Sequence, residues 1–437
     1  MRALRGALLC AGLASAACGG GSTPAAPTAT AADCSPRGQS GFVRDTLRDI
    51  YLWYRELPDP DPAGFASPEA YLEAVRYRLF DTTFSYIAPK AVDQAFFSDS
   101  QFIGFGFSTV LLASDDYRVT DVFAGSPAAE AGLERGARIL EINGRTVADL
   151  VASGALDGAF GPSEIGVTAI VTFRDRGGRE LTSSMTKRLV TIPPVALTQT
   201  YSSGGQLVGY LVLKNFVTPT TPALNEAFAR LAAEGVEDLV LDVRYNGGGL
   251  VSVAQHLAGL IGGAPTREQV FVRFVHNDKN TFRDTALRFP QPASALGLER
   301  IVVITSRLSA SASELMISGL RPYVQVTVVG DRTYGKPVGQ YSFDFCDRVL
   351  HPVSFSARNA RNEGDYFEGI PADCGAPDDL AHALGDPAEG SLAEALRYLR
   401  TGACSSTATA AARAQARRRP ARQPHQADGW QSLVVAY

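Results

Sequence analysis

The sequence predicts a multidomain α/β protein whose largest domain contains a mainly parallel β-sheet. The main observation is that short apolar, β-branched runs alternate with helix-compatible stretches through the second half of the chain. Strands are expected at 207–213, 238–244, 301–305 and 324–329, and helices near 221–231, 251–260 and 315–320. Alternation of this kind is typical of parallel strands joined by helical crossovers. A length of 437 residues also leaves room for smaller domains before this core.

Composition and charge exclude several classes of protein. The chain is 45% hydrophobic and 20% charged, and its net charge of −4 gives no general attraction to nucleic acid. None of the five histidines lies in a Ser-His-Asp context, and the sequence has no Gly-x-Ser-x-Gly elbow. No His or Cys pair has the spacing of a zinc site. We therefore expect no nucleic-acid partner, no metal and no cofactor.

The N-terminus predicts an exported protein. Residues 1–17 combine two arginines with an apolar run that is too short to span a membrane, as in a secretory signal peptide. Small residues then lead to Cys18, which resembles a bacterial lipoprotein cleavage site, although Ser15 stands where Leu is usual. Cys18 is the expected lipid anchor, and residues 18–33 are the expected flexible tether. We expect a periplasmic or cell-surface lipoprotein, with the outer membrane favoured; plain secretion is the alternative.

Residues 34–98 are expected to form a small helical domain. Apolar residues between Phe42 and Leu57 recur at helical spacing. The run Ser67-Pro68-Glu69 supplies a cap, a first-turn proline and an acidic residue, which together begin a second helix.

Residues 99–190 carry the pattern of a small β domain. A Ser-Pro helix start near 126–127 is followed by a strand at 139–142 and by an Asn143-Gly144 turn of the hairpin type. This combination resembles a PDZ domain. PDZ domains bind an extended C-terminus by strand addition and hold its carboxylate with loop N–H groups.

The resemblance places the carboxylate-binding loop at Gly104, Phe105, Gly106 and Phe107. Glycines let a backbone present successive N–H groups to an anion without an intervening Cβ. The alternative is that these residues form only a strand with a close backbone approach.

The chemistry of the core is expected around Ser311, at a junction between a strand and a helix. A helix start offers unpaired N–H groups and a positive dipole end, which suit a developing oxyanion. Lys336 follows 25 residues later, after a second apolar run, so neighbouring parallel strands could bring the two residues together. From residue types alone, Ser311 could equally cap the helix with Glu314, and Lys336 could be a surface lysine.

The run Ser-Ala-Ser-Ala-Ser-Glu at 309–314, the later Gly-Lys pair and Gln340 resemble the C-terminal processing peptidases, or tail-specific proteases. The resemblance implies a crotonase-like α/β core in which Ser311 is the nucleophile, Lys336 its general base and Gln340 the residue that orients the lysine. The spacer 337–339 departs from the usual sequence but keeps the spacing. Free lysine, with a pKa near ~10.4, is a poor base at neutral pH. We therefore expect Lys336 to be desolvated and largely neutral when substrate is bound.

The strand expected at 238–244 ends in a glycine run, where ligands meet the backbone in parallel sheets. A phosphate-binding loop is the alternative, but the run lacks a Gly-Lys-Ser/Thr ending. The family resemblance implies an oxyanion hole made by the Ala312 N–H and a glycine N–H, from either Gly248 or Gly249. Asp242 and Arg244 are interpreted as a structural ion pair.

Four cysteines remain in the exported chain besides Cys18, and an even number in an oxidising compartment indicates disulfides. Three pairings are possible; our prediction is Cys346–Cys374 with Cys34–Cys404. The core is expected to extend over 191–404, and the segment 405–437, rich in Ala, Arg, Gln and Pro, to be a disordered basic tail.

These observations predict a serine endopeptidase that cleaves exported polypeptides near their C-termini, with the PDZ-like unit capturing or gating the substrate. Two alternatives use the same fold: a non-catalytic protein that holds polypeptide tails, and a carrier of hydrophobic small ligands. The substrate, its preferred residues and the oligomeric state do not follow from the sequence.

Overall fold

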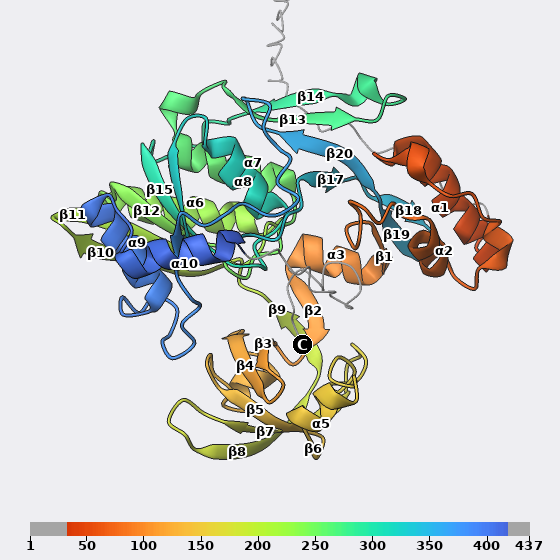
Figure 1. Ribbon diagram of the computed structural model, residues 1–437, viewed down its shortest axis with the longest axis horizontal. Helices are drawn as coiled ribbons and strands as arrows, with labels where there is room; N and C mark the ends of the chain where they lie inside the picture. The colour runs from red at the N-terminus through yellow and green to blue at the C-terminus, as the bar shows by residue number, and fades with distance from the viewer. Residues whose placement is uncertain (1–32, 418–437) are drawn as a thin grey trace, which may run out of the picture.

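The computed structural model describes residues 33–417, and within them the chain folds into three units (Figure 1). The expected signal peptide, the lipidation site Cys18 and nearly all of the tether lie outside the described residues. Within residues 33–417, no helix combines the length and apolar character needed to cross a membrane.

The N-terminal unit is helical, as its apolar periodicity predicts. Its helices and single strand are α1 (Pro36–Ile50), α2 (Pro68–Val75), β1 (Tyr86–Pro89) and α3 (Lys90–Asp99). Ser67 caps α2 by accepting from the Ala70 N–H at 3.2 Å. Strand β1 pairs with β19 (Arg348–His351), which in turn pairs with β18 (Phe343–Phe345). The N-terminal unit is therefore bound to the core through a shared sheet.

The second unit is an antiparallel β domain, which lies at the bottom of Figure 1. Its sheet runs in the order β3 (Phe107–Ala113), β4 (Asp116–Val122), β5 (Arg138–Ile142), β7 (Thr168–Arg174) and β8 (Glu180–Thr186). A separate ladder joins β2 (Gln101–Gly104) to β9 (Arg188–Thr191), so the chain enters and leaves the domain side by side. The short elements are α4 (Pro127–Glu130), β6 (Arg145–Thr146) and α5 (Val147–Ala152). The Asn143-Gly144 turn joins β5 to β6, with positive φ at both residues, as predicted.

The core is the predicted α/β layer structure around a mainly parallel sheet. The strand order is β10 (Val195–Ser203), β11 (Gln206–Leu213), β12 (Asp238–Asp242), β15 (Arg300–Thr305), β16 (Gln325–Gly330) and β21 (Cys374–Gly375). Only β10 is antiparallel to its neighbour.

Helices cover both faces of this sheet. One face packs against α6 (Thr220–Glu234), α7 (Val251–Gly262) and α8 (Ala312–Leu320), and the other against α9 (Gly390–Thr401) and α10 (Ser406–Arg417). A second sheet, in the order β14 (Thr285–Arg288), β13 (Val270–His276), β20 (Val353–Arg358) and β17 (Val338–Gln340), extends the core toward the N-terminal unit. Burial on both faces explains why the parallel strands read as continuous apolar runs.

Helix α10 corrects the prediction that disorder begins at residue 405. Ala408 is buried against the sheet, and Gly375 has no side chain to keep the helix away. A Cβ at Gly375 would lie 2.4 Å from the Ala412 nitrogen. The alanine-rich composition that suggested a solvated tail therefore also allows close packing on β21.

Candidate active site

A pocket lies where the parallel strands end, and it brings together residues that are far apart in the sequence. Five predicted site residues line it: Ser311, Lys336, Gln340, Gly248 and Gly249. The rest of its lining is Tyr86, Phe96, Phe97, Lys214, Asn215 and Gly247. The segments after β11, β12, β15 and β16 all reach this edge because the carboxyl ends of parallel strands share one side of a sheet. The N-terminal unit contributes to this lining through Tyr86 of β1 and Phe96 and Phe97 of α3.

Ser311 stands at the N-terminus of α8 with an unusual backbone. Its φ of +54° and ψ of −114° are rarely adopted by a residue with a side chain. Hydrogen bonds hold the loop around it: the Ala310 N–H and the Ser313 hydroxyl both donate to the Asn246 carbonyl oxygen. The Ser309 hydroxyl donates to the Val243 carbonyl at 2.7 Å. The surrounding structure therefore imposes the Ser311 conformation.

The glycine run packs directly against this loop. A Cβ at Gly248 would lie 2.7 Å from the Ser311 Cβ and 2.9 Å from the Ala312 nitrogen, so only glycine fits there without movement. The Gly248 N–H donates to Asn246 Oδ1 at 2.9 Å, whereas in residues 33–417 no partner accepts the Gly249 N–H. Ala312 is the first residue of α8, where the helix itself leaves N–H groups unpaired.

Lys336 is buried in the pocket wall, with 5% of its surface exposed. Its Nζ donates to Gln340 Oε1 at 2.5 Å and lies 5.8 Å from the centre of the Phe84 ring. Burial lowers the pKa of the Lys336 ammonium to about 8, while the Asp81 and Glu314 carboxylates act in the opposite direction. The neutral amine is therefore accessible near physiological pH.

Gln340 is fixed by both ends of its amide. The Nε2 group donates to the carbonyl oxygens of Phe84 and His351, each at 2.7 Å. These two acceptors require the NH2 group, so the Oε1 atom faces Lys336.

Glu314 has a larger role than the cap that the sequence suggested. Its Oε2 accepts the backbone N–H groups of Ser311 at 3.0 Å and Lys336 at 2.9 Å. Its Oε1 accepts from the Thr333 hydroxyl at 2.5 Å and the Gly335 N–H at 2.7 Å. Burial raises the pKa of Glu314, and these hydrogen bonds lower it. One carboxylate thus joins the Ser311 loop to the Lys336 loop.

Comparisons with known proteins identify the families that the three units resemble. The model of peptidase family S41 matches residues 207–374, that of the S41 N-terminal domain matches 38–86, and a PDZ model matches 118–159. The chain therefore contains S41 peptidase and S41 N-terminal domains together with a PDZ domain. Its fold is the S41 protease fold with a PDZ domain and an N-terminal domain.

Individual relatives point the same way. The chain is 31% identical over 225 residues to a carboxyl-terminal-processing protease of Synechocystis, covering 51% of this chain and 50% of that protein. It is 29% identical over 236 residues to a chloroplastic C-terminal processing peptidase of Tetradesmus obliquus, covering 51% and 48%. The chain therefore spans about half the length of these curated relatives. A solved structure assigned to the S41 proteases, from Bacteroides fragilis, is 27% identical with a TM-score of 0.67, covering 82% of this chain and 96% of that one.

The loop predicted to bind a carboxylate lies in the PDZ domain, and it is not part of the pocket. Gly104 ends β2 and Phe107 begins β3. The carbonyls of Phe105 and Gly106 accept from Ala128 and Phe123, both at 2.9 Å, so they are held inside the domain. Gly106 has a φ of +88°. The backbone thus turns sharply between β2 and β3.

A buried charged network joins the PDZ domain to the glycine run. Arg135 donates to the Tyr245 hydroxyl and, at 2.5 Å, to Asp378, while Tyr245 directly precedes Asn246. Arg244 continues the network through Asp378 at 2.9 Å. It also forms the predicted ion pair with Asp242, at 2.8 Å.

A second ion pair between the core and the PDZ domain begins at the pocket. Lys214 lines the pocket, and its Nζ lies 2.5 Å from Oδ2 of Asp121 in the PDZ domain. The two contacts thus link PDZ side chains to Lys214, which lines the pocket, and to Tyr245, two residues before Gly247.

The predicted disulfide pairing is wrong, although all four cysteines are paired. The bonds are Cys34–Cys346 and Cys374–Cys404. Helix α1 packs on the β18–β19 hairpin, where Phe42 stacks on Phe345 at 4.8 Å, and this packing brings Cys34 to Cys346.

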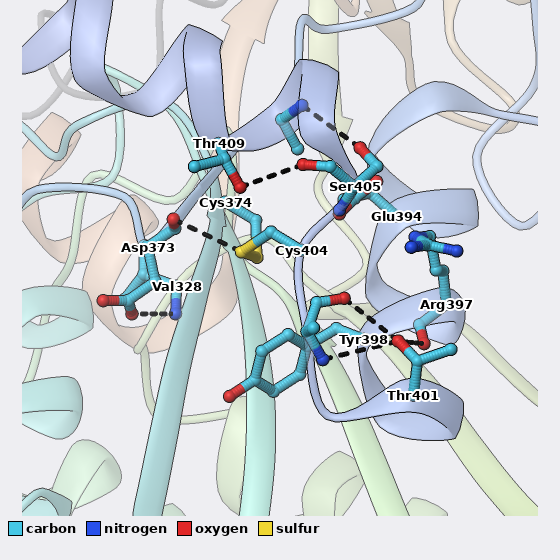
Figure 2. Close-up of a disulfide and its surroundings, with 12 residues drawn as sticks. Val328, Asp373, Cys374, Glu394, Arg397, Tyr398, Thr401, Cys404, Ser405 and Thr409 are labelled. Atoms are coloured by element: carbon cyan, nitrogen blue, oxygen red, sulfur yellow. Dashed lines mark hydrogen bonds between the residues drawn. A yellow bond between two sulfur atoms is a disulfide. The ribbon is translucent and has the colours of Figure 1, made fainter.

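The second disulfide joins strand β21 to the connection between α9 and α10 (Figure 2). Glu394 lies beside Cys374 and Cys404 in a group that resembles a metal site. The two sulfurs are bonded to each other, and Glu394 accepts the Ser405 N–H at 2.7 Å, so these atoms already have partners.

Proposed function

We propose that this chain is a serine endopeptidase that cleaves exported polypeptides near their C-termini through an acyl-enzyme intermediate. The observation that carries the proposal is the shared pocket: Ser311 in a strained backbone conformation beside a buried Lys336 whose pKa is lowered to about 8. Strained backbone and a basic group with a shifted pKa both occur preferentially at functional sites. Names of the relatives support the same reaction class.

In this mechanism neutral Lys336 accepts the hydroxyl proton of Ser311 while Oγ bonds to the substrate carbonyl carbon. The Lys336 ammonium then gives that proton to the amide nitrogen as the C–N bond breaks. Water then attacks the resulting ester and loses a proton to Lys336. Lys336 passes this proton to the Ser311 Oγ as the ester C–O bond breaks, which releases the acid product and regenerates Ser311. Gln340 keeps the lysine in place between these steps through the 2.5 Å hydrogen bond.

The N–H groups of Ala312 and Gly249 are the proposed oxyanion hole. Each such donor is worth roughly 3 kcal/mol of barrier in serine peptidases. Gly249 is preferred to Gly248 because the Gly248 N–H already donates to Asn246 Oδ1. Gly248 has a different role here: it allows the chain to approach Ser311 closely.

The PDZ domain is proposed to capture the substrate C-terminus at Gly104 to Phe107 and to gate the pocket. Arg135 contacts Tyr245, one residue before the Asn246 that holds the Ser311 loop, and Lys214 pairs with Asp121 at the pocket wall. A movement of the PDZ domain would have to break these buried contacts. Substrate binding to the domain can therefore change the geometry of the oxyanion loop.

Export and anchoring belong to the same proposal. The signal-peptide pattern and Cys18 favour a lipoprotein on the periplasmic or cell-surface side of a membrane. The two disulfides support an oxidising compartment.

The decisive experiment combines a fluorophosphonate probe with an analysis of cleavage products. The unmutated protein is expected to be labelled on Ser311 and to generate new C-termini in a mixture of exported proteins, as read by mass spectrometry. Ser311→Ala should do neither, and Ser126→Ala, a cap in the PDZ domain, should be labelled normally. A protein that binds polypeptide tails without modification or cleavage would be a non-catalytic receptor, and the proposal would be wrong.

A further inference from the structure

We propose that Asp81, in the N-terminal unit, is a positioning residue for the Ser311–Lys336–Gln340 site. Its role is to shape the turn whose backbone carbonyl orients Gln340. This inference rests on the proposed function and assigns the N-terminal unit a part in it.

Asp81 is fully buried, and both of its oxygens accept hydrogen bonds. Oδ1 accepts the N–H groups of Phe84 at 2.9 Å and Ser85 at 3.0 Å. Oδ2 accepts from the Ser85 hydroxyl at 2.6 Å and the Tyr51 hydroxyl at 2.9 Å. A buried carboxylate is costly unless it is satisfied in this way, so the turn from Asp81 to Ser85 is organised around its side chain.

The turn is also attached to the core. The Ser85 hydroxyl accepts the Val353 N–H at 2.9 Å, and Thr83 contacts the Tyr334 hydroxyl at 3.1 Å. These contacts fix where the Phe84 carbonyl points.

The Phe84 carbonyl is one of the two acceptors that hold the Gln340 amide, at 2.7 Å. If the turn loosens, Gln340 keeps only the His351 carbonyl and can rotate. Its oxygen would then leave the Lys336 Nζ, which lies 2.5 Å away. Asp81 therefore acts on the base through two intermediates, the Phe84 carbonyl and the Gln340 amide.

Asp81 also acts on Lys336 through its charge. Two carboxylates, Asp81 and Glu314, raise the pKa of Lys336 against the effect of burial. The other ionisable groups that line the same pocket are Tyr86 and Lys214. Removing the Asp81 charge should therefore lower the pKa of Lys336 further, which distinguishes this role from simple support of the fold.

The test is Asp81→Asn in the otherwise complete protein, measured by the pH dependence of kcat/KM on a peptide substrate. We expect kcat to fall about tenfold, and the acid limb of the profile to move down by about half to one pH unit. In a Gln340→Ala background the same substitution should lower kcat by less than about threefold, because its effect passes through Gln340. Asp59→Asn is the matched control: it removes an exposed carboxylate of the same unit, paired with Arg48, and should change neither quantity.

Different failures have different meanings. Absence of Ser311 labelling and of Ser311-dependent cleavage in the unmutated protein overturns both the function and this inference. Normal labelling and cleavage, with an unmoved acid limb in Asp81→Asn, overturns this inference alone. If Asp81→Asn does not fold, Ser85→Ala keeps the Asp81 charge but removes two hydrogen bonds of the turn, one to Asp81 and one from the Val353 N–H. It should lower kcat about threefold without moving the limb, and an unchanged kcat would contradict the inference.

Discussion

Two serines, Ser126 and Ser311, stand at the starts of helices in this molecule, and they differ in their backbones. Ser126 precedes α4 with an extended backbone, φ −88° and ψ 162°, and accepts the Ala129 N–H at 3.2 Å. Ser311 precedes α8 with a φ of +54°. In sequence each has the features of a cap. The difference is that the surroundings of Ser311 force it into a conformation that a simple cap would not need.

Holding that conformation costs on the order of 1–3 kcal/mol, which contacts elsewhere must offset. Around Ser311 these contacts are the Glu314 carboxylate, the Asn246 carbonyl and the closely packed Gly248. Ser126 has an ordinary backbone and needs no such support. The comparison suggests that backbone conformation, more than a local motif, separates the serine expected to react from the one expected to cap.

Ser311→Ala should have the largest effect on the rate of cleavage, with little change in stability. We expect kcat/KM for peptide cleavage to fall by about 10⁴-fold or more, since the nucleophile is lost. The free energy of unfolding should stay within about 0.5 kcal/mol of the original, because alanine keeps the packing. Steady-state kinetics and urea unfolding measure the two quantities. Retained cleavage by Ser311→Ala would mean that Ser311, like Ser126, is only a helix cap.

Gly248→Ala should disrupt the same site through the glycine loop that packs against Ser311. The added Cβ would lie 2.7 Å from that of Ser311, so the loop must move, and kcat should fall about 100-fold. Gly132→Ala is the matched control because Gly132 also has positive φ, +80°, but no atom lies within 4 Å of an added Cβ. It should cost about 1–2 kcal/mol of stability and leave kcat unchanged. Equal kinetic effects of the two variants would contradict the close approach as the cause.

The pH dependence tests the base beside Ser311. Catalysis needs neutral Lys336, so kcat/KM should fall about tenfold per pH unit below pH 8 and level off above it. Stability should follow a related course: the folded-state pKa is below the unfolded value, so the unfolded chain binds more protons between about pH 8 and 10.5. The contribution of Lys336 to stability therefore increases with pH across this window. A flat rate profile from pH 6 to 9 would argue against a lysine base.

Ser126→Ala should give the smallest effect on the rate of cleavage. Loss of the cap is expected to lower the free energy of unfolding by about 1 kcal/mol. A short peptide that reaches Ser311 without the PDZ domain should be cleaved at the original rate. Denaturant unfolding and kinetics on that peptide provide the measurements; a large kinetic loss would mean that Ser126 is more than a cap.

Much of the architecture follows from local sequence patterns. Strand and helix periodicity predicted the parallel core, and the Asn143-Gly144 turn and the Ser67 cap form as expected. Topology explains why Ser311 and Lys336 reach one pocket, since parallel strands end at the same edge.

Features set by packing between distant segments could not be predicted in this way. The partner of Cys34 depends on how α1 packs against a hairpin more than 300 residues away in the chain. Three of the four hydrogen bonds of Glu314 depend on the path of the 333–336 loop. Gly248 and Gly249 look equivalent in sequence, and they are separated only by tertiary contacts: the Gly248 N–H donates to Asn246 Oδ1, and Gly248 packs against Ser311.

The Cys34–Cys346 bond has a consequence for how this molecule would tolerate damage. Its partners are 312 positions apart, so it closes a covalent ring that contains the PDZ domain, Ser311 and Lys336. One backbone cut anywhere within the ring opens it but releases no fragment. If neighbouring copies nick each other, the pieces stay joined until a reductant separates them, and such nicks would be visible only on reducing gels.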